Sequence, residues 1–222
     1  METQRIPLFP LNVVLFPGMA LPLHIFEPLY RQMIRRCLDG DQRFGVCLIR
    51  SGPEVGGPAD PHSVGSLCQI AHVHALEDGR MNLLVVGVSR FQVVRLYHDE
   101  AYLEGDVTEV GDEPHGELGA LPTEVRSGIQ RFVRRILTLS GQEPQELEFP
   151  DDPVALSFQA AALLQCELPT RQELLETRDT ESRLRRGLEL LRGSLEKVNS
   201  LVAARSRVAV PFRASKDRIC LN

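Results

Sequence analysis

The hydrophobic period of the sequence changes close to Val110, and this change constrains the fold more than any other feature. Ahead of Val110, apolar and polar side chains alternate within short segments that Pro and Gly interrupt, which is typical of strands. Beyond it, apolar residues recur every three or four positions, which is typical of helices with one buried face. The sequence therefore predicts an α+β protein in which a strand-rich first half precedes an all-helical second half.

Two turns organise the predicted sheet. The tetrapeptide Phe16-Pro17-Gly18-Met19 places Pro and Gly at the centre of a type II turn, where Pro fixes φ and Gly tolerates a positive φ. Asp78-Gly79 lies between two apolar runs and predicts a tight hairpin. Strands at such close spacing favour closure into a barrel or a sandwich. The expected strands are 13–16, 20–23, 44–49, 67–76, 81–88, 91–96 and 102–110.

One helix is predicted inside the strand-rich half, from Pro28 to Gly40. Pro is preorganised for the first position of a helix, and Gly commonly follows the last one. Residues 51–63 follow with three Gly and three Pro, and we expect a long mobile loop there. The buried stripe of the helix is expected to be Tyr30, Met33, Ile34, Cys37 and Leu38.

Four helices are predicted in the second half, at 122–139, 154–166, 172–176 and 180–205. Asp152-Pro153 supplies an N-cap and a first-turn Pro for the second of them, and Thr170-Arg171-Gln172-Glu173 is a capping box for the third. Leucines along the last helix alternate in spacing between four and three, and packing within the bundle explains this seam. We predict three regions, namely a β-barrel subdomain at 1–115, a helical bundle at 116–206 and a basic tail at 207–222.

Several blocks of the sequence stand in a characteristic order, namely IPLFPLNVVLFPGMALPLHIFEP at 6–28, VGSLCQI at 64–70, DGRMNLLVVGVSRF at 78–91 and LPTRQELLET at 168–177, followed by Arg183-Leu184 and the leucine seam. These blocks resemble the substrate-binding region at the N-terminus of Lon-type ATP-dependent proteases. Together they span about residues 5 to 200. The resemblance implies a PUA-like β pseudo-barrel with one inserted helix, then an all-α helical bundle, and a role in contacting protein substrates.

The sequence lacks the motifs that the catalytic steps of Lon-type proteases need. Lys197 and Lys216 are its only lysines and neither follows a Gly, so no G-x-x-x-x-G-K-[ST] loop exists to cradle a nucleotide. A Ser-Lys peptidase pair needs a lysine on a rigid scaffold, whereas these lysines fall on a predicted bundle helix and in the tail. We therefore expect a stand-alone, non-catalytic module without ATPase, peptidase or cofactor.

Histidine and cysteine residues give no strong sign of a reactive site. His72 and His74 share one face of a strand, a spacing found in metal sites, but no spacing favours a third ligand, so we expect no metal. The five cysteines form no CxxC pair, and Cys37 and Cys47 fall on predicted core positions, so we expect buried, reduced thiols. No apolar run approaches the roughly 20 residues of a membrane span, and no signal peptide is recognisable, which favours a cytoplasmic protein.

A polypeptide-binding surface is predicted at two places. Methionine and aromatic side chains around the first turn and the inserted helix would suit variable partners, although the same residues would also serve as core. The loop at 51–63 is the second place. Backbone pairing at an open sheet edge is the binding mode we expect, because it does not demand one client sequence. The candidate residues are Met19, Leu21, Phe26, Tyr30, Met33, Gly52, Val55 and His62.

Three functions remain open from the sequence. The first is a module that captures unfolded or tagged polypeptides, as an adaptor for a separate protease or chaperone. The second is RNA binding, which other PUA-like barrels perform; the formal net charge of −5 argues against nucleic acid, because phosphate binding needs basic surface. The third is a regulatory domain that binds a small ligand between barrel and bundle. The sequence does not predict the oligomeric state.

Overall fold

The computed structural model describes residues 3–57, 59–143, 147–164 and 166–208. A single sheet of seven strands occupies the first half of the described chain, and helices occupy the second, as the change in hydrophobic period predicts. The strands are β1 (Gln4–Leu11), β2 (Ala20–Ile25), β3 (Arg43–Ser51), β4 (Asp60–Pro61), β5 (Val64–Ala75), β6 (Met81–Tyr97) and β7 (Glu104–Glu109). The helices are α1 (Pro28–Asp39), α2 (Leu121–Leu139), α3 (Pro153–Leu163), α4 (Leu168–Glu176) and α5 (Thr180–Val208).

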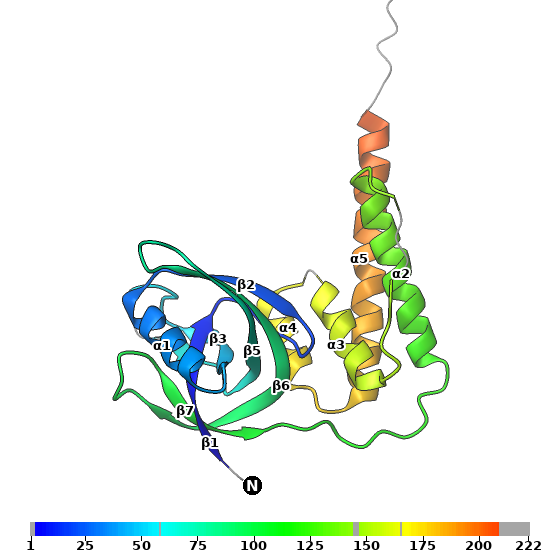
Figure 1. The fold of residues 1–222 in the computed structure, drawn as a ribbon. Coiled ribbons are helices and arrows are strands. Elements are labelled where there is room, and N and C mark those ends of the chain that lie inside the picture. Colours follow the sequence, from blue (N-terminus) through cyan, green and yellow to red (C-terminus); the bar gives the residue numbers. More distant parts are fainter. Residues whose placement is uncertain (1–2, 58, 144–146, 165, 209–222) are drawn as a thin grey trace, which may run out of the picture.

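The strand pairings form a ring. The order β1-β7-β6-β5-β3 returns to its start because β3 also pairs with β1, in parallel, whereas the other pairings of the ring are antiparallel. The buried side chains of α1, Met33 and Ile34 among them, join the core that the ring encloses. Outside the ring, β2 lies along the first half of β6, and β4 lies along the end of β3 (Figure 1). The fold is therefore a mostly antiparallel sheet accompanied by five helices.

Both predicted turns are present. Gly18 has a φ of 78° and the Met19 amide donates to the Phe16 carbonyl at 3.0 Å, which is the geometry of the expected type II turn. Gly79 has a φ of 80° in the hairpin that joins β5 to β6. These turns are encoded locally, since Gly accepts a positive φ without steric cost.

The prediction of a strand at 13–16 is wrong. Val14 and Phe16 point into the core of the helices, whereas Leu15 between them points into the core of the ring. The segment therefore lies between two cores and pairs with no strand. Side chains satisfy two of its carbonyls instead, because the Ser66 hydroxyl donates to the Leu15 carbonyl and the Arg171 guanidinium donates to the Val14 carbonyl.

Two further boundaries differ from the prediction. The strands expected at 81–88 and 91–96 are one continuous strand, β6, because shifts of register in its pairings with β5 and β7 absorb the irregularity between them. Helix α4 begins at Leu168 with Pro169 in its first turn, so Thr170 lies within the helix and is not its cap. Asp152 caps α3 as predicted, since its carboxylate accepts from the amides of Val154 and Ala155.

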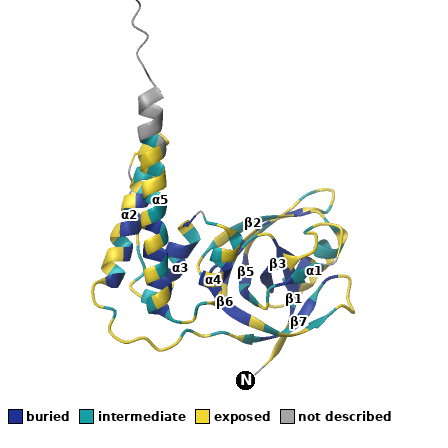
Figure 2. Ribbon diagram, turned by 180° about the vertical axis from the view of Figure 1, so that it is seen from behind, coloured by how far each residue is buried: buried dark blue, intermediate teal, exposed yellow. Residues whose placement is uncertain are grey.

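Helices α2, α3 and α5 pack together beside the ring, and α4 lies between the ring and α3 (Figure 1). Leu184, Leu188 and Leu191 of the seam are buried in this bundle, which confirms the interpretation that the seam packs within its own chain. Beyond Leu191, the described side chains of α5 are partly or fully exposed (Figure 2).

The predicted domain boundary at residue 115 falls in the segment 110–120, which has no helix or strand, and the division into subdomains stays a prediction. The basic tail lies almost entirely outside the described residues.

Candidate functional site

A cleft of about 640 Å³ opens where the sheet meets the helices. The turn at 17–19, the middle of β6, the segment 109–112 and one face of α3 form its walls. Its lining is mainly apolar, which is typical of sites that bind organic or polypeptide ligands. The apolar lining residues are Pro17, Met19, Val88, Val110, Pro150, Val154, Ala155, Phe158, Ala162 and Leu163.

Two of the lining residues expose large apolar side chains to solvent. Val88 is 47% exposed and Leu163 is 36% exposed. Because side chains alternate along a strand, Leu84 and Val86 share the outer face of β6 with Val88, and Leu84 is also exposed. These residues continue the apolar surface of the cleft along the sheet. Contiguous exposed apolar surface on a globular domain commonly marks an interaction site.

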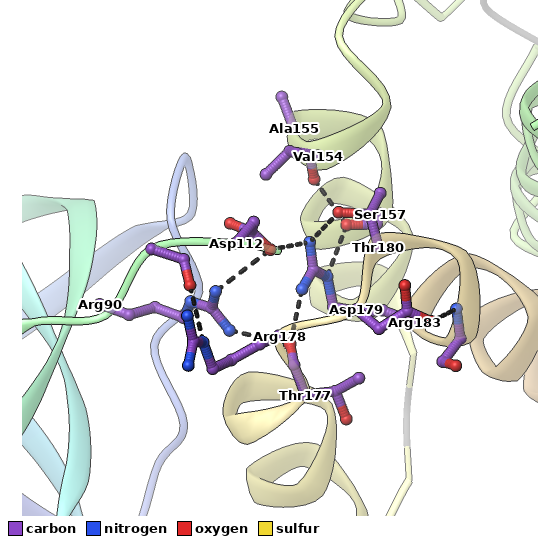
Figure 3. Close-up of polar contacts among 12 residues, drawn as sticks. Arg90, Asp112, Val154, Ala155, Ser157, Thr177, Arg178, Asp179, Thr180 and Arg183 are labelled. Carbon is purple, nitrogen blue, oxygen red and sulfur yellow. Dashed lines mark hydrogen bonds and ion pairs between the residues drawn. The ribbon is translucent and has the colours of Figure 1, made fainter. Parts of the chain in front are cut away.

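A buried ionic network underlies the cleft (Figure 3). Arg90 of β6 and Arg183 of α5 both contact one Asp112 carboxylate oxygen, through guanidinium nitrogens at 3.1 and 2.6 Å. Both guanidinium groups lie over the Phe158 ring of α3, at 5.2 and 4.0 Å from its centroid. Neither arginine side chain is more than 1% exposed. One aspartate therefore links the sheet to the last helix directly beside the cleft.

Backbone and hydroxyl oxygens complete this network. Arg90 donates to the carbonyls of Leu175 and Thr177 at 2.8 and 2.9 Å. Arg183 donates to the same Thr177 carbonyl and to the Ser157 hydroxyl, each at 2.6 Å. Burial lowers the pKa of both arginines and Asp112 opposes that shift, but arginine starts so far above neutrality that both side chains remain cations. These carbonyl and hydroxyl oxygens offset the desolvation cost of burying two cations beside a single carboxylate.

Arg171 of α4 makes a second junction between the two halves. Its guanidinium donates to the Leu164 carbonyl at the end of α3, at 2.7 Å, and to the Val14 carbonyl, at 3.3 Å. It also lies 3.8 Å from the Met19 sulfur and 5.0 Å from the centroid of the Phe16 ring. Met19 is thereby held at the edge of the cleft by contacts that come from the helical half.

The structure separates the residues that the sequence predicts around the first turn. Met19 lines the cleft, and Leu21 is partly buried against the core of the ring. Phe26 is 48% exposed but lies past the far end of β2, where its ring stacks on His24. Tyr30 packs on Phe9 with a distance of 4.0 Å between ring centroids. Met33 is completely buried, because it lies on the inner stripe of α1, and its side chain packs in the core instead of facing a ligand.

The predicted loop residues lie away from the cleft. Gly52 and Val55 are exposed, and the neighbouring Glu54 anchors the loop because its carboxylate accepts from the Asn12 amide and side chain. His62 lies closer to the helices, with its Nδ1 at 3.8 Å from a Glu176 carboxylate oxygen of α4. The cleft residues Val88, Asp112 and Leu163 were not predicted, although the alternation along 81–88 places Val88 on the outer face.

A larger hollow, of about 920 Å³, runs along α5, but charged side chains dominate its lining. Several of those charges are already paired, as in the contacts of Arg186 with Glu189 and of Arg192 with Glu124. Such pairing is typical of a solvated helix face. The cleft is therefore the better candidate for a binding site.

No reactive thiol lies in the cleft. Burial raises the pKa of Cys37 to about 11 and that of Cys47 to about 12, and it also raises the pKa of Cys68. These thiols are protonated at neutral pH and are poor nucleophiles, as expected from their core positions. Cys220 lies outside the described residues.

Within the described ranges, no three His, Cys, Asp or Glu side chains are placed to hold a metal ion. No helix in these ranges is both long and apolar enough for a membrane span.

Comparison with known proteins gives consistent matches. The model of the family described as the ATP-dependent protease La (LON) substrate-binding domain matches residues 5–193. A Lon protease of Xanthomonas oryzae pv. oryzae is 28% identical over 228 residues, and Lon protease 2 of Myxococcus xanthus is 29% identical over 193. These alignments cover 100% and 85% of this chain but 27% and 23% of the relatives, so the chain spans about a quarter of their length.

Two solved structures share the fold. The crystal structure of a Lon N-terminal domain protein from Xanthomonas campestris matches with a TM-score of 0.61 and 29% identity, over 84% of this chain and 98% of that one. The N-terminal domain of a Mycobacterium avium complex Lon protease matches with a TM-score of 0.63 and 21% identity, over 85% and 98%.

Proposed function

The chain belongs to the LON substrate-binding domain family, and from this premise we propose that it is a non-catalytic module that binds unfolded or tagged polypeptides in the cleft. The observation that carries the proposal is the apolar cleft between sheet and helices, with Val88 and Leu163 exposed at its walls. Unfolded chains differ from folded ones in exposing apolar side chains, and a cleft of this kind buries such side chains.

Strand β2 offers a way to hold the backbone of a client. Among the strands that the structure describes, β2 pairs only with β6, so its other edge is open to an added strand. Its first residue, Ala20, directly follows Met19 in the cleft. An extended polypeptide along β2 would therefore place an apolar side chain in the cleft while its backbone pairs with the edge. Pro22 lacks an amide hydrogen, so the added ladder would miss one donor at that position.

In this proposal the ring is a PUA-like pseudo-barrel that carries the binding surface. The buried arginine network holds the walls of the cleft in fixed positions relative to one another. Delivery of the bound client to a separate protease or chaperone, in the cytoplasm, would be the adaptor role. RNA binding is not favoured, because the exposed ionisable groups of the cleft lining, Glu109 and Asp152, would repel a phosphate backbone, whereas the arginine of the lining, Arg90, is buried and paired with Asp112.

Substitution of Val88 by Asp tests the cleft. We expect the affinity for a permanently unfolded, carboxymethylated protein to fall roughly ten-fold, because an apolar contact is lost and a charge would be buried without a partner. Fluorescence anisotropy of the labelled client measures the dissociation constant.

Val94→Asp is the matched control, because Val94 lies on the same strand, is 61% exposed and does not line the cleft. It should leave the affinity within about two-fold of the parent protein, as expected for a site outside the interface. Equal affinities for the two variants would show that the client binds elsewhere.

A further inference from the structure

A separate cavity of about 470 Å³ lies between α1, the loop that follows β3 and the connection from β6 to β7. It shares no lining residue with the cleft. Its walls are largely apolar or aromatic, and they include Tyr30 and residues of the loop at 51–63. The lining residues are Pro10, Leu29, Tyr30, Gly56, Gly57, Ala59, His98, Glu100, Ala101, Tyr102 and Leu103.

The two tyrosines of this cavity are held in place. Tyr30 packs on Phe9, with 4.0 Å between the ring centroids. Tyr102 is buried, and its hydroxyl accepts a hydrogen bond from Arg36 at 2.8 Å. These contacts stabilise both rings in the positions that form the aromatic wall, and no ligand is needed for them. Preorganised walls reduce the entropic cost of binding.

The charged residue in the lining of the cavity, Glu100, is acidic, and the cation beside the lining, Arg36 at the Tyr102 hydroxyl, is already paired with Glu104. No lysine or arginine belongs to its lining, whereas Glu100 does. Burial raises the pKa of Tyr30 to about 12, and the negative charges of Glu27 and Glu54 add to that shift. In the part of the chain that the structure describes, no basic group lies within ion-pair distance of Glu27, Glu54 or Glu100.

We propose that this cavity binds the side chain of a lysine or arginine carried by a polypeptide. The apolar stem of such a side chain would pack against Leu29 and the tyrosine rings, and its cationic head would face Glu100. A tyrosine elsewhere in the protein already holds cations in this way, since Arg5 and Arg95 lie 4.0 and 4.9 Å from the centroid of the Tyr97 ring. This proposal depends on the proposed function in one respect, namely that a polypeptide carries the basic side chain.

Small probes test the cavity without a client. Nα-acetyl-lysine-N-methylamide supplies the basic side chain, and Nα-acetyl-norleucine-N-methylamide supplies a similar stem without the charge. The protein has three tyrosines, so the ring signals in an NMR spectrum are few enough to assign. We expect the lysine probe to shift the ring signals of Tyr30 and Tyr102 in a saturable way and to leave those of Tyr97 in place. The norleucine probe should bind about two- to five-fold more weakly than the lysine probe, which is the effect expected of one partly exposed cation contact.

Glu100→Gln removes one charge while preserving the size of an exposed side chain, so we expect an intact fold and a two- to five-fold weaker affinity for the lysine probe. Glu77→Gln is the control, because Glu77 is also exposed, lies in the β5–β6 hairpin and does not line the cavity. It should leave the affinity unchanged.

The outcomes separate this proposal from the proposed function. Equal binding of both probes, or unchanged affinity in Glu100→Gln, would overturn the cavity assignment even where an unfolded protein still binds in the cleft. A lysine probe that behaves as expected would support the cavity even where no unfolded protein binds, and the proposed function alone would then fail.

Discussion

Arg183→Met should lower the free energy of unfolding by about 3 kcal/mol, because it removes one partner of a buried ionic network. Arg183 has no exposed surface, and its nitrogens contact Asp112, Ser157 and the Thr177 carbonyl. Methionine keeps much of the aliphatic volume beside Phe158 but donates no hydrogen bond. The loss falls near the lower end of the range for broken buried pairs, because Arg90 still reaches Asp112 and Thr177.

Arg185→Met on the same helix is the control for this variant. The Arg185 side chain is 66% exposed, and its contact with Glu181 is a surface pair one helical turn apart. Such pairs contribute about 0.3–0.5 kcal/mol, so its removal should change stability by less than 1 kcal/mol. Urea unfolding followed by far-UV circular dichroism measures both variants. If both variants lost a similarly small part of the free energy of unfolding, the buried network would not be what holds the sheet and the helices together.

Gly87→Ala should cost about 3 kcal/mol, at the upper end of the range for overpacked sites. A β-carbon at this position would lie 2.3 Å from the Phe16 carbonyl oxygen and 3.0 Å from its carbon. Both are backbone atoms of the segment between the two cores, so no side-chain rotation can relieve the clash. The Gly87 amide and carbonyl also bond to Met19 and Gly18, so a displaced β6 would disturb the turn that lines the cleft.

Gly116→Ala shows the effect of a methyl group without a clash. A β-carbon there meets no atom within 4 Å, and Gly116 is not among the residues with a positive φ. We expect a change in stability within about 0.5 kcal/mol, as for an ordinary surface site. Thermal and urea unfolding compare the two variants. If Gly87→Ala unfolds at the same denaturant concentration as the parent protein, the segment at 13–16 is packed less closely against β6 than described.

Locally encoded features were predictable from the sequence. Gly18 and Gly79 form their turns, and Asp152 caps its helix, because neighbouring residues alone decide these conformations. The segment 13–16 has the composition of a strand, but its partners come from distant parts of the chain. Ser66 and Arg171 take the place of a neighbouring strand, and no local pattern reveals that exchange.

The candidate site was less predictable, for the same reason. Met19 was found from its residue type, and it does line the cleft. Arg90 and Arg183 occur within the blocks that carry the family resemblance, yet nothing in their spacing shows that both contact Asp112. The alternation along β6 predicts that Val88 faces outward, but no local pattern shows that the helices pack beside the ring and bring Leu163 to the same cleft.

Hydrogen exchange of the whole chain, with and without a saturating unfolded protein, tests most directly whether the cleft and the β2 edge bind clients. Amides on the open edge of β2 have no strand partner, so they should exchange quickly in the free protein. We predict that the client slows exchange in residues 17–25 and 109–112 and leaves the outer half of α5 unchanged. Slower exchange confined to α5, or no change in the cleft at saturation, would contradict the proposed binding surface.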